Sequence, residues 1–223
     1  AEPKSALERL DERTSVAPFS HAVKFQLQVA ASHLTLLINA AAIDETIQYG
    51  GYSLIRGALE AGVTARWLML PGTDAKRVLR SLQLSWSDQG DANEFATATG
   101  LSYEGDLKRI RANLEGDRQR MKALRQSSLD KPRVHRTAMI REVDQKTKPA
   151  LIPSIESSWR LCSGLAHGNQ PTTNMMFQRR RFDPTNPDLY VAESSWAIVT
   201  PMVRTTLSVL DTAVEQLSTL ARA

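Results

Sequence analysis

An arginine and a histidine stand seven residues apart in the stretch SSWRLCSGLAHGNQP, which covers residues 157–171. Seven residues make nearly two turns of an α-helix, so Arg160 and His167 are expected on the same helix face. An imidazole titrates near neutral pH and can move a proton, and a guanidinium can bind a phosphate through two parallel hydrogen bonds. These two residue types at this spacing are therefore suited to cleavage of a phosphodiester.

The same helix face carries further polar residues at helical spacing. Ser163 lies between the arginine and the histidine, and Glu156 lies one turn before Arg160. One interpretation is an active site built along this line. The other is an ordinary helix end, in which Glu156 pairs with Arg160 and the sequence His167-Gly168 terminates the helix. Gly164 is expected to let another backbone come close, such as that of a second copy of this helix.

A second pair of charges lies in the otherwise apolar stretch LIRGALEAGV. Arg56 and Glu60 are four residues apart, and the order Arg before Glu is the poorer one for stabilising an isolated helix. Charges on an apolar helix usually need partners. The hypothesis is that Glu60 reaches Arg160 or His167 from a neighbouring helix and fixes its orientation. The alternative is a self-contained pair at the surface.

Apolar residues that recur every three or four positions indicate the helices that must position these side chains. Helices are expected over residues 20–46, 52–70, 73–97, 103–127 and 137–146, in the motif stretch after Pro153, and from Ser195 or Thr200 to about residue 221. Gly50-Gly51 is expected to break the chain between the first two. Residues 168–193 are rich in proline and predict a long loop or a small β-hairpin. The fold class predicted is all-α, a helical bundle of about six helices, with residues 1–18 as an arm or short helix and residues 19–223 as a single domain.

Composition excludes several classes of protein. Hydrophobic residues make up 42% of the chain and charged residues 23%, which is typical of a globular protein. No nucleotide-binding glycine loop, HExxH motif or clustered His and Cys residues are present, so neither a cofactor nor a metal is expected. Cys162 is the single cysteine, which excludes an internal disulfide and predicts a small buried residue. No apolar run approaches the length of a membrane span, and the charged N-terminus resembles no targeting peptide. No membrane contact and a cytoplasmic location are therefore predicted.

Positive charge is concentrated in the middle of the chain. Residues 103–148 contain 13 Lys or Arg and 7 Asp or Glu, whereas the whole chain has a net charge of +4. An acidic partner such as RNA is one interpretation, and a solvated, salt-bridged helix face is the other. No aromatic residues alternate with the basic ones, so base stacking is not indicated. The candidate nucleic-acid-binding residues are Lys108, Arg109, Arg111, Arg118, Arg120, Lys122 and Arg125, with Arg179, Arg180 and Arg181 in the later segment.

The stretch WRLCSGLAHG resembles the motif of the HEPN superfamily of helical, nucleic-acid-associated proteins, in which four to six residues separate an arginine from a histidine near the end of a late helix. The helix LIRGALEAGVTARWLML, followed by a basic helix, is similar to helical proteins often grouped near that superfamily. The resemblance implies a HEPN-like bundle. It also implies that Arg160 binds phosphate, that His167 is the acid–base residue, and that a ribose 2′-hydroxyl attacks to leave a cyclic phosphate.

The resemblance further implies a homodimer, in which two copies of the motif form one cleft. The function predicted is a metal-independent endoribonuclease of the toxin or defence type, with an antitoxin or regulatory protein as a further partner. Two alternatives stay open. One is a non-catalytic helical dimer that binds nucleic acid or a partner protein, and the other is a purely structural dimer.

Overall fold

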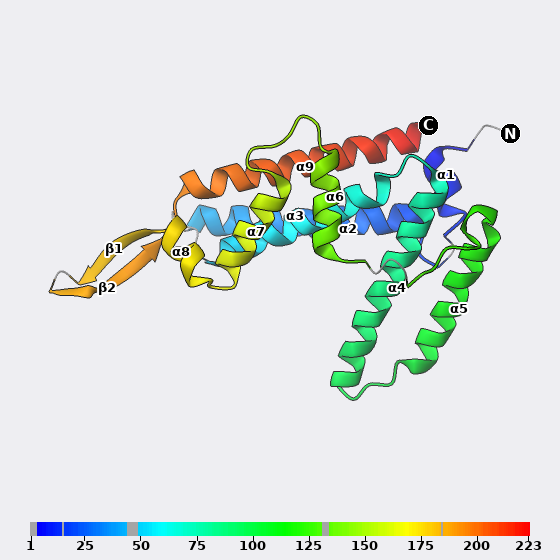
Figure 1. Cartoon of the computed structure of the whole chain (residues 1–223), viewed down its shortest axis with the longest axis horizontal. Coiled ribbons are helices and arrows are strands. Elements are labelled where there is room, and N and C mark those ends of the chain that lie inside the picture. Colours follow the sequence, from blue (N-terminus) through cyan, green and yellow to red (C-terminus); the bar gives the residue numbers. More distant parts are fainter. Residues whose placement is uncertain (1–3, 15, 44–48, 131–133, 184) are drawn as a thin grey trace. The chain divides into compact units, whose positions relative to one another are not determined.

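The structure of the protein is a computed structural model that describes residues 4–14, 16–43, 49–130, 134–183 and 185–223. The described residues form nine α-helices, one short 3₁₀ helix and a two-stranded sheet, which confirms the predicted all-α helical bundle (Figure 1). The helices are α1 (Ala6–Asp11), α2 (Phe19–Ile43), α3 (Tyr49–Met69), α4 (Asp74–Ala98), α5 (Glu104–Arg120), the 3₁₀ helix η1 (Lys122–Leu124), α6 (Arg136–Lys146), α7 (Ile155–Ala166), α8 (Gln170–Met176) and α9 (Trp196–Arg222), and the strands are β1 (Gln178–Asp183) and β2 (Asn186–Glu193).

The chain divides into two compact units. Unit 1 comprises residues 1–25, 65–139 and 213–223, and unit 2 comprises residues 26–64 and 140–212. Helices α2, α3, α6 and α9 contribute residues to both units. Of the two interpretations of the N-terminal segment, the short helix is the one observed, because Ser5 and Glu8 form a reciprocal capping box at the start of α1. The single domain expected over residues 19–223 stays a prediction.

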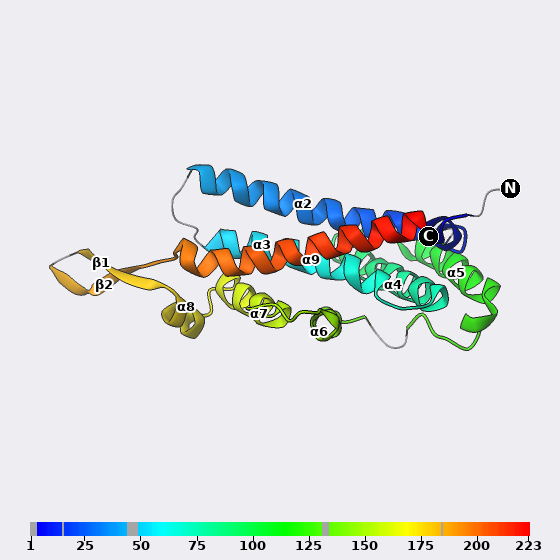
Figure 2. The same cartoon turned by 90° about the horizontal axis from the view of Figure 1, so that it is seen from above.

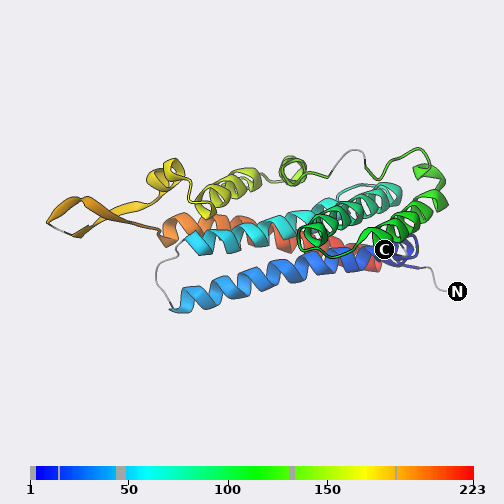
Figure 3. The same ribbon diagram turned by 90° about the horizontal axis from the view of Figure 1, so that it is seen from below.

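The core of unit 2 joins four helices and the segment before the hairpin. Its buried residues come from α2, α3, α7 and α9 and from the residue that follows α8, and they are Leu37, Tyr52, Ile55, Cys162, Leu165, Phe177, Val199 and Met202. Helices α3 and α9 run alongside each other here (Figure 3). Gly62 makes this close approach feasible, since a Cβ atom at that position would lie 2.9 Å from Cδ2 of Leu210. Residues of the candidate motif helix are thus anchored in a continuous apolar core.

Several helix boundaries differ from the predictions. Gly50 and Gly51 lie in the first turn of α3 instead of breaking the chain before it. Helix α9 begins at Trp196, which agrees with a start at Ser195 and not at Thr200, and Pro201 lies inside the helix. Pro201 is only the sixth helical residue, so its missing N–H removes a single hydrogen bond near the helix start. The predicted end of the first long helix near residue 46 lies outside the described residues.

The segment of residues 168–193 forms a short helix and a hairpin. Helix α8 was not predicted, whereas the hairpin was one of the two alternatives. Strands β1 and β2 are antiparallel, with Gln178 opposite Glu193 and Arg181 opposite Tyr190. Within unit 2 the hairpin extends beyond α8, on the side away from α7 (Figure 2).

Helix α2 is long enough and apolar enough to cross a membrane by length and composition, and 11% of its most apolar window is buried. Core helices of soluble proteins pass the same test. The exposed apolar side chains of α2 include Leu36, Ile38 and Ile43, which are 53%, 67% and 89% exposed. This finding contrasts with the expectation that no segment has the length and apolarity of a membrane span.

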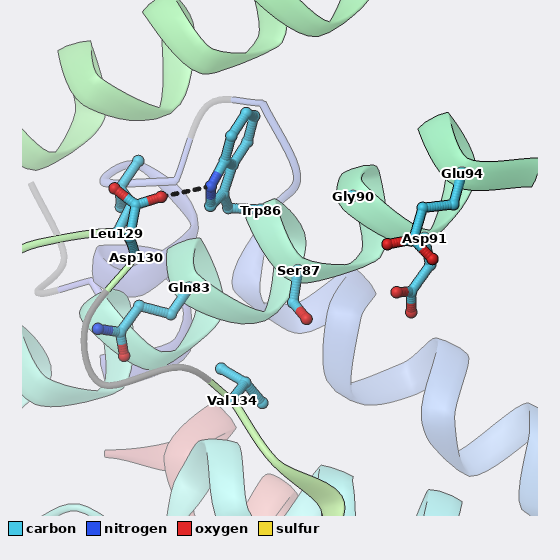
Figure 4. Close-up of a pocket in the computed structure, with 9 residues that line it drawn as sticks. All are labelled: Gln83, Trp86, Ser87, Gly90, Asp91, Glu94, Leu129, Asp130 and Val134. Atoms are coloured by element: carbon cyan, nitrogen blue, oxygen red, sulfur yellow. Dashed lines mark hydrogen bonds between the residues drawn. The ribbon is translucent and has the colours of Figure 1, made fainter. Parts of the chain in front are cut away.

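Asp130 fixes the loop after α5 within unit 1. Arg111 donates from Nη1 and Nη2 to the two oxygens of Asp130 over 2.8 and 2.9 Å, and Trp86 donates from Nε1 over 2.8 Å (Figure 4). The Arg111 guanidinium also lies 4.6 Å from the centre of the Trp86 ring. These hydrogen bonds, above all that from Arg111, lower the pKa of Asp130 to about 2.

This lowered pKa predicts an acid-sensitive contribution to stability. A carboxyl with a lower pKa in the folded state than in the unfolded state stabilises the fold above its unfolded pKa and loses that effect as the pH falls. We expect Asp130→Asn to lower the free energy of unfolding at pH 6 by about 1 kcal/mol or less, because a half-exposed ion pair is screened by solvent. The difference should shrink between about pH 4 and pH 2. Urea unfolding of both proteins at pH 6, 4 and 3 measures it, and a difference independent of pH would contradict the assignment.

Candidate active site on helix α7

The N-terminal end of α7 is held by side chains on either side of it. Ser154 is the N-cap, and its hydroxyl accepts a hydrogen bond from Ser157 N over 3.2 Å. Asp144 of α6 accepts from the backbone N–H groups of Ile155 and Glu156 over 3.0 and 3.4 Å. A carboxylate at this end also opposes the positive end of the helix dipole. Helix α6 is therefore tied directly to the first turn of α7.

The C-terminal end of α7 forms a Schellman motif. Gly168 has φ +64°, its N–H donates to Leu165 O over 3.0 Å, and the N–H of Asn169 donates to Gly164 O over 2.8 Å. Gly168 tolerates this left-handed backbone because it has no Cβ atom. His167 is the C-cap residue. The geometry agrees with the interpretation of His167-Gly168 as a helix end, but it uses only the backbone of His167.

The imidazole of His167 meets an arginine from another helix. Nε2 of His167 lies 2.8 Å from Nη1 of Arg56 on α3. A guanidinium can only donate, so Nε2 must be the acceptor and the imidazole of this arrangement is neutral, with its proton on Nδ1. His167 is exposed, so a ligand can reach this contact from solvent. A neutral imidazole can act as a general base, and the permanent cation beside it can bind a phosphate.

Glu60 positions the arginine of this pair. Its Oε1 accepts from Arg56 Nε over 2.8 Å and from Trp159 Nε1 over 2.6 Å. The guanidinium of Arg56 also lies 5.9 Å from the centre of the Trp159 ring. The hypothesis placed Glu60 against Arg160 or His167 directly. In the structure Glu60 instead contacts Arg56 and Trp159, and Arg56 makes the contact with His167. Arg56 and Glu60 are thus no self-contained surface pair.

Arg160 has a different partner. Its Nε and Nη2 atoms donate to Oε1 of Glu156 over 2.9 and 2.6 Å, which is the pair expected from the helical spacing. Arg141 of α6 donates from Nε to the same oxygen over 3.1 Å. The hydrogen bonds from Arg160 first, and then from Arg141, lower the pKa of Glu156. The side chains of Arg160 and Arg141 are 55% and 53% exposed, so both keep donors that face solvent.

The space beside Gly164 is occupied by another part of the chain, the short helix α8. A Cβ atom at this position would lie 2.9 Å from Oγ1 and 3.2 Å from Cγ2 of Thr172 on α8. Thr172 is branched at Cβ and has little freedom to turn away. Ser163, the neighbouring residue, is partly buried.

Because of the contact with Thr172, we predict that Gly164→Ala changes the free energy of unfolding in the direction opposite to that expected for an isolated helix. Alanine in a helix interior is favoured over glycine by about 1 kcal/mol, so Gly164→Ala would stabilise a helix without neighbours. We expect it to destabilise this protein, because the new methyl group meets Thr172. In the Thr172→Ala background the same substitution should be neutral or stabilising. Urea unfolding of the four proteins tests this double-mutant cycle, and additive effects of the two substitutions would contradict it.

Cys162 is fully buried, which confirms the predicted packing role. It contacts Met202, with 3.3 Å between the two sulfur atoms. Burial raises the pKa of the Cys162 thiol to about 12.

A thiol with so high a pKa is predicted to be inert in the folded protein. Only the thiolate reacts with disulfide reagents. We expect native protein at pH 8 to react more than about a hundredfold more slowly than protein unfolded in urea. Because the chain has a single cysteine, the colour released by an aromatic disulfide reagent reports this residue alone. Equal rates in the folded and unfolded states would overturn the assignment.

The predicted nucleic-acid-binding residues between positions 108 and 125 belong to unit 1, and most of them are paired with acidic side chains. Arg109 contacts Asp106, Arg111 contacts Glu115 and Asp130, and Arg120 contacts Asp117. Arg118 is 8% exposed and donates from Nη1 to three backbone carbonyls, those of Leu124, Arg125 and Ser127. These carbonyls belong to a chain that turns back, which explains why α5 ends at Arg120 and not near residue 127. Arg118 therefore stabilises the fold, and the salt-bridged interpretation fits most of α5.

The other predicted nucleic-acid-binding residues lie in two separate places, around α5 in unit 1 and on β1 in unit 2. Lys108 and Lys122 are exposed, and Arg125 donates from Nε to Gln119 O over 3.3 Å. Arg179, Arg180 and Arg181 are consecutive residues of β1 in unit 2.

A cavity of about 240 Å³ also lies in unit 1, lined by Trp86, Asp91, Glu94, Asp130 and neighbouring residues (Figure 4). Its acidic lining opposes the approach of a phosphate backbone to this part of unit 1.

Comparisons with protein-family models, with curated proteins and with solved structures found no match. Among the described residues, no group of three or more His, Cys, Asp or Glu side chains is arranged to hold a metal ion.

Proposed function

We propose that the protein is a HEPN-like, metal-independent endoribonuclease of the toxin or defence type, with His167 as its acid–base residue. The observation that carries the proposal is the contact of 2.8 Å between Nε2 of His167 and Nη1 of Arg56. This contact brings the neutral imidazole of His167 and the positively charged guanidinium of Arg56 together where His167 is exposed to solvent. Arg56, held by Glu60, joins Arg160 as a phosphate-binding residue.

The reaction follows from these groups. A phosphate is a stronger acceptor for a guanidinium than a neutral imidazole is, so a bound phosphodiester takes over the donors of Arg56 and frees Nε2 of His167. Nε2 then accepts the proton of the adjacent ribose 2′-hydroxyl. The 2′-oxygen bonds to phosphorus, the bond from phosphorus to the 5′-oxygen breaks, and a 2′,3′-cyclic phosphate remains. The departing 5′-oxygen takes a proton from water, and the imidazolium of His167 gives the proton it accepted back to the solvent, so that the site returns to its neutral form.

Partner surfaces are part of the same proposal. The exposed apolar residues Leu36 and Ile43, which are seven residues apart and therefore lie on one face of α2, support contact with another protein surface. We assign this surface to the homodimer contact or to an antitoxin-like regulator. The proposed site of action is the cytoplasm.

The proposal predicts cleavage of RNA in the presence of EDTA. We expect wild-type protein to cleave a mixed-sequence RNA oligonucleotide, to leave the matching DNA oligonucleotide intact, and to yield a cyclic phosphate end. His167→Ala should reduce the rate by about 10²- to 10⁴-fold, the usual contribution of acid–base catalysis. Arg56→Lys keeps the charge but loses the two-pronged donor, and should reduce the rate by at least about tenfold.

The matched control is His21→Ala, which removes an exposed histidine of unit 1. It should cleave as fast as wild type. Binding of RNA without cleavage would favour the alternative, a non-catalytic dimer that binds nucleic acid or a partner protein. Equal cleavage by wild type and His167→Ala would contradict the proposal.

A further inference from the structure

Two arginines converge on one carboxylate at the start of α7, away from the imidazole. Arg160 of α7 and Arg141 of α6 both donate to Oε1 of Glu156. The cluster therefore has two positive charges and one negative charge. The side chains of both arginines are more than half exposed, whereas the Glu156 side chain is 24% exposed. Positive charge thus faces solvent and the single negative charge lies beneath it.

Arg141 is held in this place by the fold. It precedes Asp144 by three residues, so both side chains leave the same face of α6. Asp144 accepts two hydrogen bonds from the first backbone N–H groups of α7. The carboxylate thereby docks this face of α6 on the first turn of α7, where Glu156 lies. An arginine that is positioned in advance loses less side-chain entropy when it binds an anion.

The cluster is separate from the imidazole along the helix. Arg160 and His167 are seven residues apart, which corresponds to about 10 Å of helix rise. The guanidinium of Arg160 turns back toward Glu156, one turn further from His167. In a nucleic-acid duplex one strand carries a phosphate about every 3.4 Å along its axis. A phosphate at Arg56 and His167 and a phosphate at Arg141 and Arg160 would therefore be different phosphates of one strand.

We infer that Arg141 and Arg160 form a second phosphate-binding subsite, so that the site takes an extended single strand of RNA instead of a dinucleotide. Glu156 holds the two guanidinium groups together before the strand arrives. The strand lies along the exposed face of α7, with the phosphate to be cleaved at His167 and a phosphate at least one nucleotide away at the subsite. For the cleaved bond this inference rests on the proposed function, whereas the binding step is independent of it.

The test measures binding of a 2′-O-methyl RNA oligonucleotide of about 12 nucleotides, which cannot be cleaved, as a function of salt. Each phosphate contact on a single strand contributes about 0.7 to the slope of log Kd against log salt. We expect Arg141→Ala to lower the slope by about 0.7 and Arg141→Lys to keep it, because the slope counts charges. Arg222→Ala, which removes an exposed arginine near the C-terminus, is the matched control and should keep the slope.

Cleavage provides the second measurement. Wild type should show a higher kcat/KM for the ribose oligonucleotide than for a dinucleotide, and Arg141→Ala should lower only the value for the oligonucleotide. If wild type cleaves nothing but Arg141→Ala lowers the salt slope, the ribonuclease proposal fails and the subsite stands. If Arg141→Ala binds with an unchanged slope and is merely less stable, the arginine is a structural ion-pair partner and the inference is overturned.

Discussion

Helix α7 can carry a site because both of its ends are fixed by hydrogen bonds. Asp144 binds the first backbone N–H groups, and Gly168 closes the last turn with a left-handed backbone. At a helix end without such bonds, four backbone N–H or C=O groups have no partner in the helix, and the last turn can fray. Here the fixed ends determine where every side chain of α7 points. Asn169 extends the effect, because it completes the Schellman motif and also caps α8.

Most of the helices were predictable from the sequence, because each buries one apolar stripe and the stripe shows as a period of three or four residues. The N-cap of α4 is of the same local kind, because the Thr73 side chain accepts from the backbone N–H of Lys76, three residues later. The predictions of helix boundaries were wrong where contacts with loop residues or with distant parts of the chain determine the structure. Helix α5 ends early because Arg118 binds carbonyls of the following turn, and no periodicity reports that contact. Helix α8 is a seven-residue helix with a single buried residue, which gives no apolar stripe to detect.

The candidate site was predictable only in its local part. Helical spacing identified the line of Arg160 and His167 and the pairing of Arg160 with Glu156. The partner of His167 comes from α3, 111 residues away, and Arg141 comes from a different helix. Two charges in an apolar helix were a usable signal for Arg56 and Glu60, whereas nothing in the sequence around Arg141 distinguished it. A count of basic residues also could not show that Arg118 is buried and that Arg109, Arg111 and Arg120 are paired with acids.

The close contact between α7 and α8 also constrains how this sequence can vary among related chains. The space beside Gly164 is filled by the branched side chain of Thr172, so a larger residue at 164 fits only if residue 172 becomes smaller. The two positions lie eight residues apart and on either side of the turn at Gly168. In a set of natural relatives they should therefore vary as a pair, and a lineage that changed one without the other would have to separate α8, and the hairpin that follows it, from the helix that carries His167.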